Sequence, residues 1–313
     1  MKISEKIKAN ATKFIFKVNP YGWLRSLKAH IQQLENNKSL LKQALEYKTQ
    51  EIKNNTVIQA LYIRSLLKNN QVNVAHDSVM RSNYKPARPK PYSEYLEKLR
   101  SIDPVVFKEW EQCFNHGMIS YMEEREHSCS TWSNEYARAF KYFISVHASG
   151  RLLDQGCGIY GVPYYLEDYP VDLISAIEPL EPVVESGFEI VRGFSEFLPW
   201  PDASFKTIVN GTSLDHVLCL DTAISETHRV LQNDGSFLVW IASIKGASIY
   251  NPSVKPIKPV DKFHLFHFHE SWFEDAMKEK FYIYDKLVFP TPSFDHIFYN
   301  FKKKVTSSEG TTN

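Results

Sequence analysis

The sequence predicts an α/β fold: a doubly wound, Rossmann-like and mostly parallel sheet with an N-terminal helical or coiled-coil extension. A glycine-rich turn follows the apolar run that ends at Asp154, and short apolar runs then alternate with helical periods. Such alternation favours a parallel sheet whose ligands bind at the carboxyl ends of the strands. A heptad pattern that begins at Leu24 indicates the extension.

The chain begins with an arm, residues 1–29, that is basic and apolar together. The arm carries seven lysines and arginines against one glutamate, a charge of +6 in a chain of net charge +1, which leaves −5 for the remainder. A mildly acidic body argues against a nucleic-acid partner. The arm fits a helix that contacts a membrane surface or a partner protein, and packing on its own domain is the alternative.

Apolar residues spaced alternately three and four apart form a heptad seam after Pro20, and two lysines interrupt it. This spacing keeps one helix face toward a partner helix. We therefore expect a homo-oligomer through residues 24–67, most simply a parallel dimer, with a helix folded back on its own domain as the alternative. The seam positions are Leu24, Leu27, Ile31, Leu34, Lys38, Leu41, Leu45, Lys48 and Ile52, and Val57, Ile58, Leu61, Tyr62, Leu66 and Leu67 continue the helical period.

Three prolines, Pro86, Pro89 and Pro91, mark the end of the extension, because they remove amide donors and bias the preceding residues toward extended conformations. The expected segments are an arm and coiled-coil helix at 1–70, a linker at 71–92, a folded domain with a helical lead-in at 93–301, and a disordered tail at 302–313. Within the domain we expect strands at 151–154, 173–177, 206–210 and 236–242, and helices at about 162–168 and 221–231.

The composition favours a cytoplasmic protein. No uncharged apolar run approaches the ~18 residues of a membrane span, and no signal-peptide core follows Met1. The four cysteines are widely spaced and form no paired metal pattern. We expect a cytoplasmic location, with peripheral contact at the inner face of the membrane through the arm as a further hypothesis.

Five motifs occur in a fixed order over roughly residues 148–290, and together they resemble class I S-adenosylmethionine (SAM)-dependent methyltransferases of the small-molecule type. A looser similarity links the chain to bacterial glycan-biosynthesis methyltransferases through the details at 161–163 and 213–217. The motifs are the turn Leu152–Gly161, the run 173–177 that ends in Glu178, the segment Gly193–Phe205, the segment Leu214–Val217 and the segment Glu226–Gly235.

The resemblance implies SAM as the methyl donor and assigns roles around it. Gly156 and Gly158 would let the methionine part approach the backbone, Asp154 would orient its ammonium directly or through water, and Glu178 would grip the ribose hydroxyls. Ser195 and Glu196 would flank the adenine, and Asn210 would lie beneath the methionine chain. Phe194 stands where an acid often contacts the adenine amine, so packing on the ring replaces that contact.

Candidate bases for a hydroxyl acceptor are Asp215, His216, His264 and His267, because histidine has the unperturbed pKa closest to neutrality. If the segment 264–269 is a strand, His264 faces away from His267 and His269, so at most the latter two act together. The sequence offers these histidines no evident carboxylate as a third metal ligand, and we expect no metal.

These observations predict a SAM-dependent methyltransferase (EC 2.1.1.-) that O-methylates a sugar or another small polar acceptor in cell-surface glycan biosynthesis. The alternative is a coiled-coil assembly protein whose methyltransferase-like domain binds SAM without turnover. Nucleic-acid methylation is disfavoured because no Asn/Asp-Pro-Pro-Tyr-type base-flipping motif follows the expected strand 206–210.

Overall fold

The computed structural model describes residues 20–69, 85–123, 131–245 and 258–304. The chain divides into two compact units, residues 1–53 and 54–313. Most of the expected arm and linker, 1–19 and 71–84, and residues 305–313 of the expected tail lie outside the described residues. Within the described ranges, no helix is long and apolar enough to cross a membrane.

One helix, α2 (Pro20–Asn69), contains the heptad seam. The residues of α2 up to Lys53 are the described part of the first unit. Seam residues in this part are exposed to solvent, among them Leu41 at 72% and Leu45 at 69%. The predicted helix is confirmed, and self-association through its seam stays a prediction.

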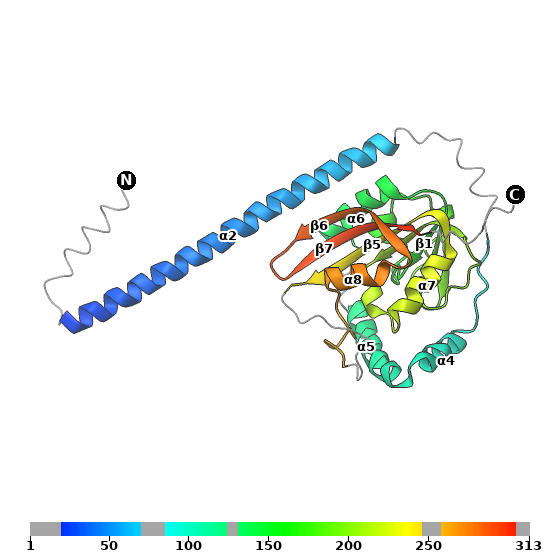
Figure 1. Cartoon of the computed structure of the whole chain (residues 1–313), viewed down its shortest axis with the longest axis horizontal. Coiled ribbons are helices and arrows are strands. Elements are labelled where there is room, and N and C mark those ends of the chain that lie inside the picture. Colours follow the sequence, from blue (N-terminus) through cyan, green and yellow to red (C-terminus); the bar gives the residue numbers. More distant parts are fainter. Residues whose placement is uncertain (1–19, 70–84, 124–130, 246–257, 305–313) are drawn as a thin grey trace. The chain divides into compact units, whose positions relative to one another are not determined.

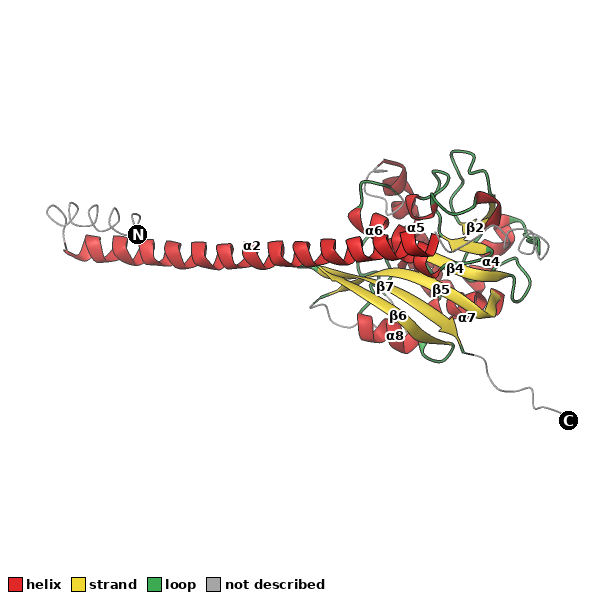
Figure 2. Cartoon of the chain, turned by 90° about the horizontal axis from the view of Figure 1, so that it is seen from above, coloured by secondary structure: helices red, strands yellow, loops and turns green. Residues whose placement is uncertain are grey.

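The second unit contains a seven-stranded sheet in the order β3-β2-β1-β4-β5-β7-β6. Neighbouring strands from β3 to β5 pair in parallel, and β7 pairs antiparallel with both β5 and β6 (Figure 2). This sheet confirms the predicted fold class. The strands are β1 (Leu152–Gln155), β2 (Ile174–Glu178), β3 (Glu189–Arg192), β4 (Phe205–Gly211), β5 (Leu231–Ile244), β6 (Phe281–Pro290) and β7 (Phe294–Lys303).

Helices cover both faces of the sheet (Figure 1). One buried cluster joins the sheet to α4 (Tyr92–Ile102), α5 (Pro104–Glu123), α7 (Leu220–Val230) and α8 (Glu270–Met277). A second cluster, on the other face, joins the sheet to α6 (Glu135–His147) and to Leu61 of α2. Three short 3₁₀ turns, η3 (Tyr164–Leu166), η4 (Val171–Leu173) and η5 (Leu214–His216), complete the described elements.

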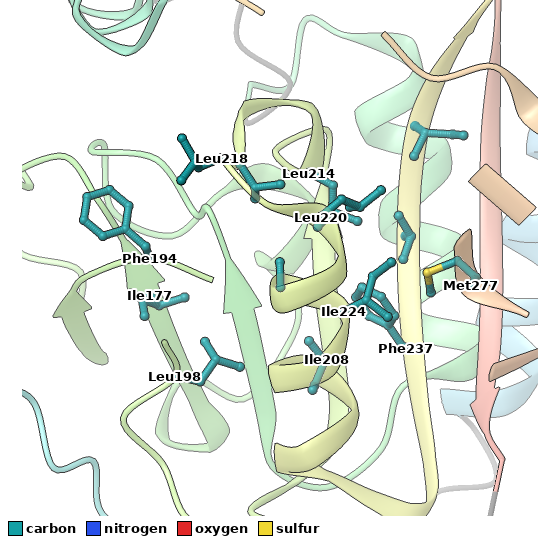
Figure 3. Close-up of a cluster of buried hydrophobic side chains, with 14 of the residues drawn as sticks. Ile177, Phe194, Leu198, Ile208, Leu214, Leu218, Leu220, Ile224, Phe237 and Met277 are labelled. Atoms are coloured by element: carbon teal, nitrogen blue, oxygen red, sulfur yellow. The ribbon is translucent and has the colours of Figure 1, made fainter. Parts of the chain in front are cut away.

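Successive residues of β5 alternate between the two clusters, as the twofold period of a strand requires. Phe237 and Val239 pack in the first cluster, and Leu238 and Trp240 pack in the second. Figure 3 shows Ile224 of α7 in the first cluster, next to side chains of β4 and β5. This two-sided burial explains why the strands are nearly uniform apolar runs.

Several sequence expectations need correction. The helix expected at about 162–168 is the short turn η3, because Pro163 precedes it and the chain bends again at once. The tail does not begin at residue 302: Lys302 and Lys303 belong to β7, where their ammonium groups bond to Ser236 Oγ (2.7 Å) and the Leu231 carbonyl (2.9 Å). The β6–β7 pair and the short β3 were not expected.

The C-terminal part of α2 folds against its own domain, which was the alternative to self-association for that part. Leu61 is 3% exposed, and Val57 and Ile58 pack against the same cluster. Lys68 Nζ also donates to the Ala148 carbonyl at 2.7 Å. The expected seam at 24–67 is therefore too long, because the face at 57–61 is already covered by the domain. Among the described seam positions, Leu34, Leu41 and Leu45 are exposed and could contact a partner helix.

Candidate functional site

The glycine turn follows β1 at the carboxyl edge of the parallel strands. Gly156 and Gly158 have φ of +82° and +80°, a region that side chains with a Cβ rarely adopt. A Cβ on Gly156 would collide with the Ser213 side chain, and a Cβ on Gly158 would collide with the Tyr121 hydroxyl. Both glycines are thus required by the protein's own backbone and neighbours, in addition to any close approach of a ligand.

Glu178 at the end of β2 is fixed to this turn by backbone donors. Its Oε2 accepts from Gly158 N at 2.8 Å, and its Oε1 accepts from Leu180 N at 3.0 Å. Burial raises the pKa of Glu178 to about 7, although the two N–H groups oppose the rise. Each carboxylate oxygen keeps a second lone pair for another donor.

Asp154 at the end of β1 is fully buried beneath the turn. The Tyr165 hydroxyl donates to its carboxylate, at 3.1 Å from Oδ2 and 3.3 Å from Oδ1. Burial raises the pKa of Asp154 to about 8; the bond from Tyr165 lowers it, and the charge of Glu178 raises it further. Asp154 therefore stays largely protonated near neutrality unless a cation enters the site.

Glu196, beyond β3, bonds to the segment that leads into α7. Its Oε1 accepts from Leu218 N at 2.7 Å and from Cys219 N at 3.2 Å. Burial raises the pKa of Glu196 to about 7 against these donors. Glu196 and Ser195 both line the cavity described below.

Asn210 near the end of β4 holds two loops together. Its Nδ2 donates to the Gln155 carbonyl at 3.1 Å and to Ser213 Oγ at 2.7 Å, and its Oδ1 accepts from Ser213 N at 3.0 Å. Asn210 and Asp154 are buried and lie behind the residues that line the cavity. The structure gives Asn210 a bracing role, and its predicted position beneath a methionine chain stays a prediction.

A cavity lies over the glycine turn, and both polar groups and aromatic rings line it. Gly156, Gly158, Glu178, Ser195 and Glu196 supply polar groups. Phe194 and three residues of α5, namely Trp110, Phe114 and Met118, supply part of its apolar lining. Phe194 is buried and packs edge-on against Trp110, with 5.6 Å between ring centroids.

Beside this cavity, Asp261 orients two histidines. His264 Nδ1 lies 2.9 Å from Asp261 Oδ1, and His267 Nε2 lies 2.9 Å from Asp261 Oδ2. Asp261 Oδ1 also accepts from the backbone N–H groups of Phe263 (2.7 Å) and His264 (2.8 Å), which bends the chain. The expectation that His264 and His267 face opposite ways is therefore wrong, because the segment 264–267 is not a strand.

Asp215 and His216 of η5 face His264 from the end of β4. Asp215 Oδ2 lies 3.8 Å from His264 Nε2, and Asp215 Oδ1 lies 3.9 Å from His216 Nε2. The His216 and His264 rings stack with their centroids 4.5 Å apart. The four predicted catalytic residues thus form one cluster, whereas His269 bonds to Ser271 Oγ at 3.0 Å outside it.

Sequence reasoning missed four residues of this region. Asp261 could have been found from its position three residues before His264, which suits a carboxylate that orients an imidazole. Tyr121, Tyr165 and Ser213 gave no comparable signal, because their neighbours in the site are distant in sequence. Their contacts with the glycine turn and Asp154 depend on how α5, η3 and the loop after β4 fold over it.

Comparison with known proteins gives a family match over part of the chain and several solved structures. Residues 153–239 match the model of a family described as a methyltransferase domain. No curated protein sequence matches the chain. The 1,6-didemethyltoxoflavin-N1-methyltransferase of Burkholderia thailandensis, solved with its substrate and S-adenosylhomocysteine, is 20% identical, with 70% of this chain and 93% of that chain covered and a TM-score of 0.48.

A second solved structure is a possible histamine N-methyltransferase of Thermotoga maritima. It is 19% identical, with 60% of this chain and 99% of that chain covered and a TM-score of 0.42. Likeness at this level carries no argument about substrate. The match over residues 153–239 covers the glycine turn, Glu178, Glu196 and the loop after β4.

Proposed function

We propose that this chain, which carries a class I SAM-dependent methyltransferase domain, transfers a methyl group from SAM to a hydroxyl of a sugar or another small polar acceptor. The observation that carries the proposal is the placement of a polar cluster, Asp215, His216, Asp261, His264 and His267, beside the cavity over the glycine turn. His216 belongs to both, and the cavity also includes Phe263 and Leu265, the sequence neighbours of His264.

The residues that line the cavity suit the chemical groups of SAM. Its aromatic wall at Trp110, Phe114 and Phe194 would cover the adenine, and Ser195 and Glu196 would flank it. The free lone pairs of Glu178 would accept from the two ribose hydroxyls. Asp154 would pair with the ammonium, directly or through water, and that cation would draw the carboxyl back to its ionised form.

SAM supplies an already activated methyl group, so the protein mainly has to hold the acceptor in line and help remove a proton from a hydroxyl. Asp261 fixes the rings of His264 and His267 beside the cavity. His264 or His267 would orient or deprotonate the acceptor, with Asp215 or His216 assisting from the other wall.

The test compares turnover and SAM affinity in the full chain. Alanine at the true base should lower turnover about 10²-fold or more and leave SAM affinity nearly unchanged. His269→Ala is the matched control, because its ring lies in the same segment but bonds to Ser271. If Asp215, His216, His264 and His267 can each become alanine with near-full turnover, the enzyme works by alignment alone.

A role in cell-surface glycan synthesis rests on the basic arm and on the exposed helix face of the first unit. An enzyme that acts on glycans assembled at a membrane would gain from contact with an anionic surface through residues 1–29. Flotation of the chain with vesicles containing anionic lipid tests this contact, and neutral vesicles are the control. Equal flotation with both would contradict an electrostatic contribution.

The exposed seam also favours the second candidate, an assembly protein whose domain binds SAM without turnover. Leu34, Leu41, Leu45 and Ile52 are 62–72% exposed, and a partner helix would bury them. The two candidates differ in turnover rather than in oligomeric state. SAM binding without methyl transfer to any of a panel of sugars and other small polar acceptors would favour the assembly protein.

A further inference from the structure

Five metal-ligating side chains lie together beside the cavity. They fall into two overlapping sets that share His264: Asp261, His264 and His267 in one, and Asp215, His216 and His264 in the other. Within each set, one potential ligand atom per residue lies within 4.8 Å of the others. The two sets differ in whether their side chains already form hydrogen bonds with other groups of the protein.

In the set around Asp261, the side chains bond to one another without an ion. Its nitrogen–oxygen distances of 2.9 Å, from His264 Nδ1 and from His267 Nε2, are those of ordinary hydrogen bonds. Asp261 Oδ1 also receives the backbone N–H groups of Phe263 and His264. This carboxylate therefore acts as a hydrogen-bond acceptor for the imidazoles.

The set around Asp215 is not complete. The distances of 3.8 Å to His264 Nε2 and 3.9 Å to His216 Nε2 are too long for hydrogen bonds. Asp215 Oδ1 is buried and has no hydrogen-bond partner among the described residues, a costly state for a carboxylate. Two ligands at ~2.0–2.2 Å from one ion lie at most about 4.4 Å apart, so one ion can bridge these gaps.

The imidazoles of this set are also held by groups outside it. His264 Nδ1 is held by Asp261, and the His216 ring interacts with the backbone of Phe263. Metal-bound histidines commonly carry such an outer carboxylate or carbonyl, which fixes the ring and leaves the other nitrogen for the metal. In His264 the nitrogen that remains is Nε2, which is the one nearest Asp215. His216 also has its Nε2 near Asp215.

We propose that Asp215, His216 and His264 bind one divalent transition-metal ion, with Asp261 as the outer carboxylate that orients His264. Two imidazole nitrogens and one carboxylate suit Zn²⁺, Fe²⁺ or Mn²⁺. Three protein ligands leave coordination positions open, as in catalytic rather than structural sites. The His216 side chain is 46% exposed, which gives an ion a path of entry.

The role of this ion rests on the proposed function. His216 lines the cavity, so an ion bound to it would lie next to the methyl donor and could hold and polarise an acceptor oxygen. With the ion bound, both ring nitrogens of His264 are engaged, so His267 would be the base. The site itself is independent of that role, because it can be tested without an acceptor. The expectation of no metal rested on the lack of a carboxylate partner, and the fold supplies two.

The experiment measures Zn²⁺ binding to the full chain by calorimetry after chelation and dialysis, and Co²⁺ binding by its visible absorption. We expect one ion per chain in the wild type. His264→Ala and Asp215→Asn should abolish binding, and Asp261→Asn should weaken it about 10- to 100-fold, the usual effect of losing an outer ligand. SAM affinity and thermal melting, measured on each variant, show whether it is folded.

Two controls separate this site from other Zn²⁺ ligands. His269→Ala removes an imidazole of the same segment and should leave binding unchanged. Cys113→Ser removes a thiol that lies 3.9 Å from the Asp261 carbonyl, and it should also leave binding unchanged. Absence of binding in the wild type, or binding that survives in folded His264→Ala and Asp215→Asn, would overturn the inference.

The failures of the two proposals are distinguishable. Stoichiometric Zn²⁺ binding in a chain that methylates no acceptor would support the metal site and refute the proposed reaction. Full methyl transfer by a chain that has been treated with chelator and binds no Zn²⁺ would support the proposed reaction and refute the metal site.

Discussion

Replacing Glu178 by glutamine tests the donor site most directly, because the change keeps the shape of the side chain. The two carboxylate oxygens each accept one backbone N–H, from Gly158 at 2.8 Å and from Leu180 at 3.0 Å. A glutamine must turn its NH₂ group toward one of these donors, which loses that bond, and it also removes acceptor capacity for the ribose hydroxyls. The expected loss of SAM affinity is about 10- to 100-fold, from ~1.5–3 kcal/mol for hydrogen bonds to a charged group.

The assay is calorimetry at pH 8, where the Glu178 carboxyl, with a pKa of about 7, is mostly ionised. Glu181→Gln is the matched control, because its carboxylate is 80% exposed three residues further along. SAM affinity unchanged in Glu178→Gln would move the ribose contact to another residue. An equal loss in Glu181→Gln would show that general charge, and not this contact, sets the affinity.

The same variant has a stability signature that depends on pH. The pKa of Glu178 is 4.5 when unperturbed and about 7 in the folded chain, so the folded state binds the extra proton between these values. The wild type is therefore favoured at low pH, and it loses stability relative to Glu178→Gln as the pH rises through 7. Between pH 5 and 8 the difference in unfolding free energy should change by about 2–3 kcal/mol. A pH-independent difference in urea unfolding would refute the reasoning.

Three further predictions concern other parts of the chain. The free energy of unfolding of the ligand-free wild type should fall from pH 5 to 8, because Asp154 and Glu196 also have raised pKa values of about 8 and about 7. A free energy of unfolding that rises over this range would contradict the prediction. Asn210→Ala should cost about 2–3 kcal/mol in urea unfolding, since three hydrogen bonds of a buried amide are lost. A cost below about 0.5 kcal/mol would exclude the bracing role. The double substitution Leu41→Ser and Leu45→Ser should lower the oligomeric state seen by sedimentation, whereas Leu40→Ser with Tyr47→Ser, off the seam and also exposed, should not; equal effects would count against the seam.

Local sequence patterns were sufficient to predict the parallel part of the sheet. Strands β1, β2 and β4 and the central part of β5, residues 236–242, are mostly apolar runs buried on both faces, and such runs are visible without knowledge of their partners. The glycine turn was equally visible, because positive φ at Gly156 and Gly158 demands a residue type that the sequence shows directly. Glu178 could be placed near the turn because it ends the next strand, whose carboxyl edge is shared.

Tertiary structure decided what depends on contacts between distant segments. The seam prediction could not separate a helix face that meets a partner from one that meets its own sheet, and only packing shows that Leu61 is covered. The direction of His264 relative to His267 depends on the bend that Asp261 imposes, not on strand alternation. Asp215 and Asp261 face the same imidazole from 46 residues apart, since the loop after β4 and the segment before α8 meet at the cavity. The local sequence pattern determines which residues are buried and where the backbone turns. A site built from separate loops forms only when the folded sheet brings those loops together.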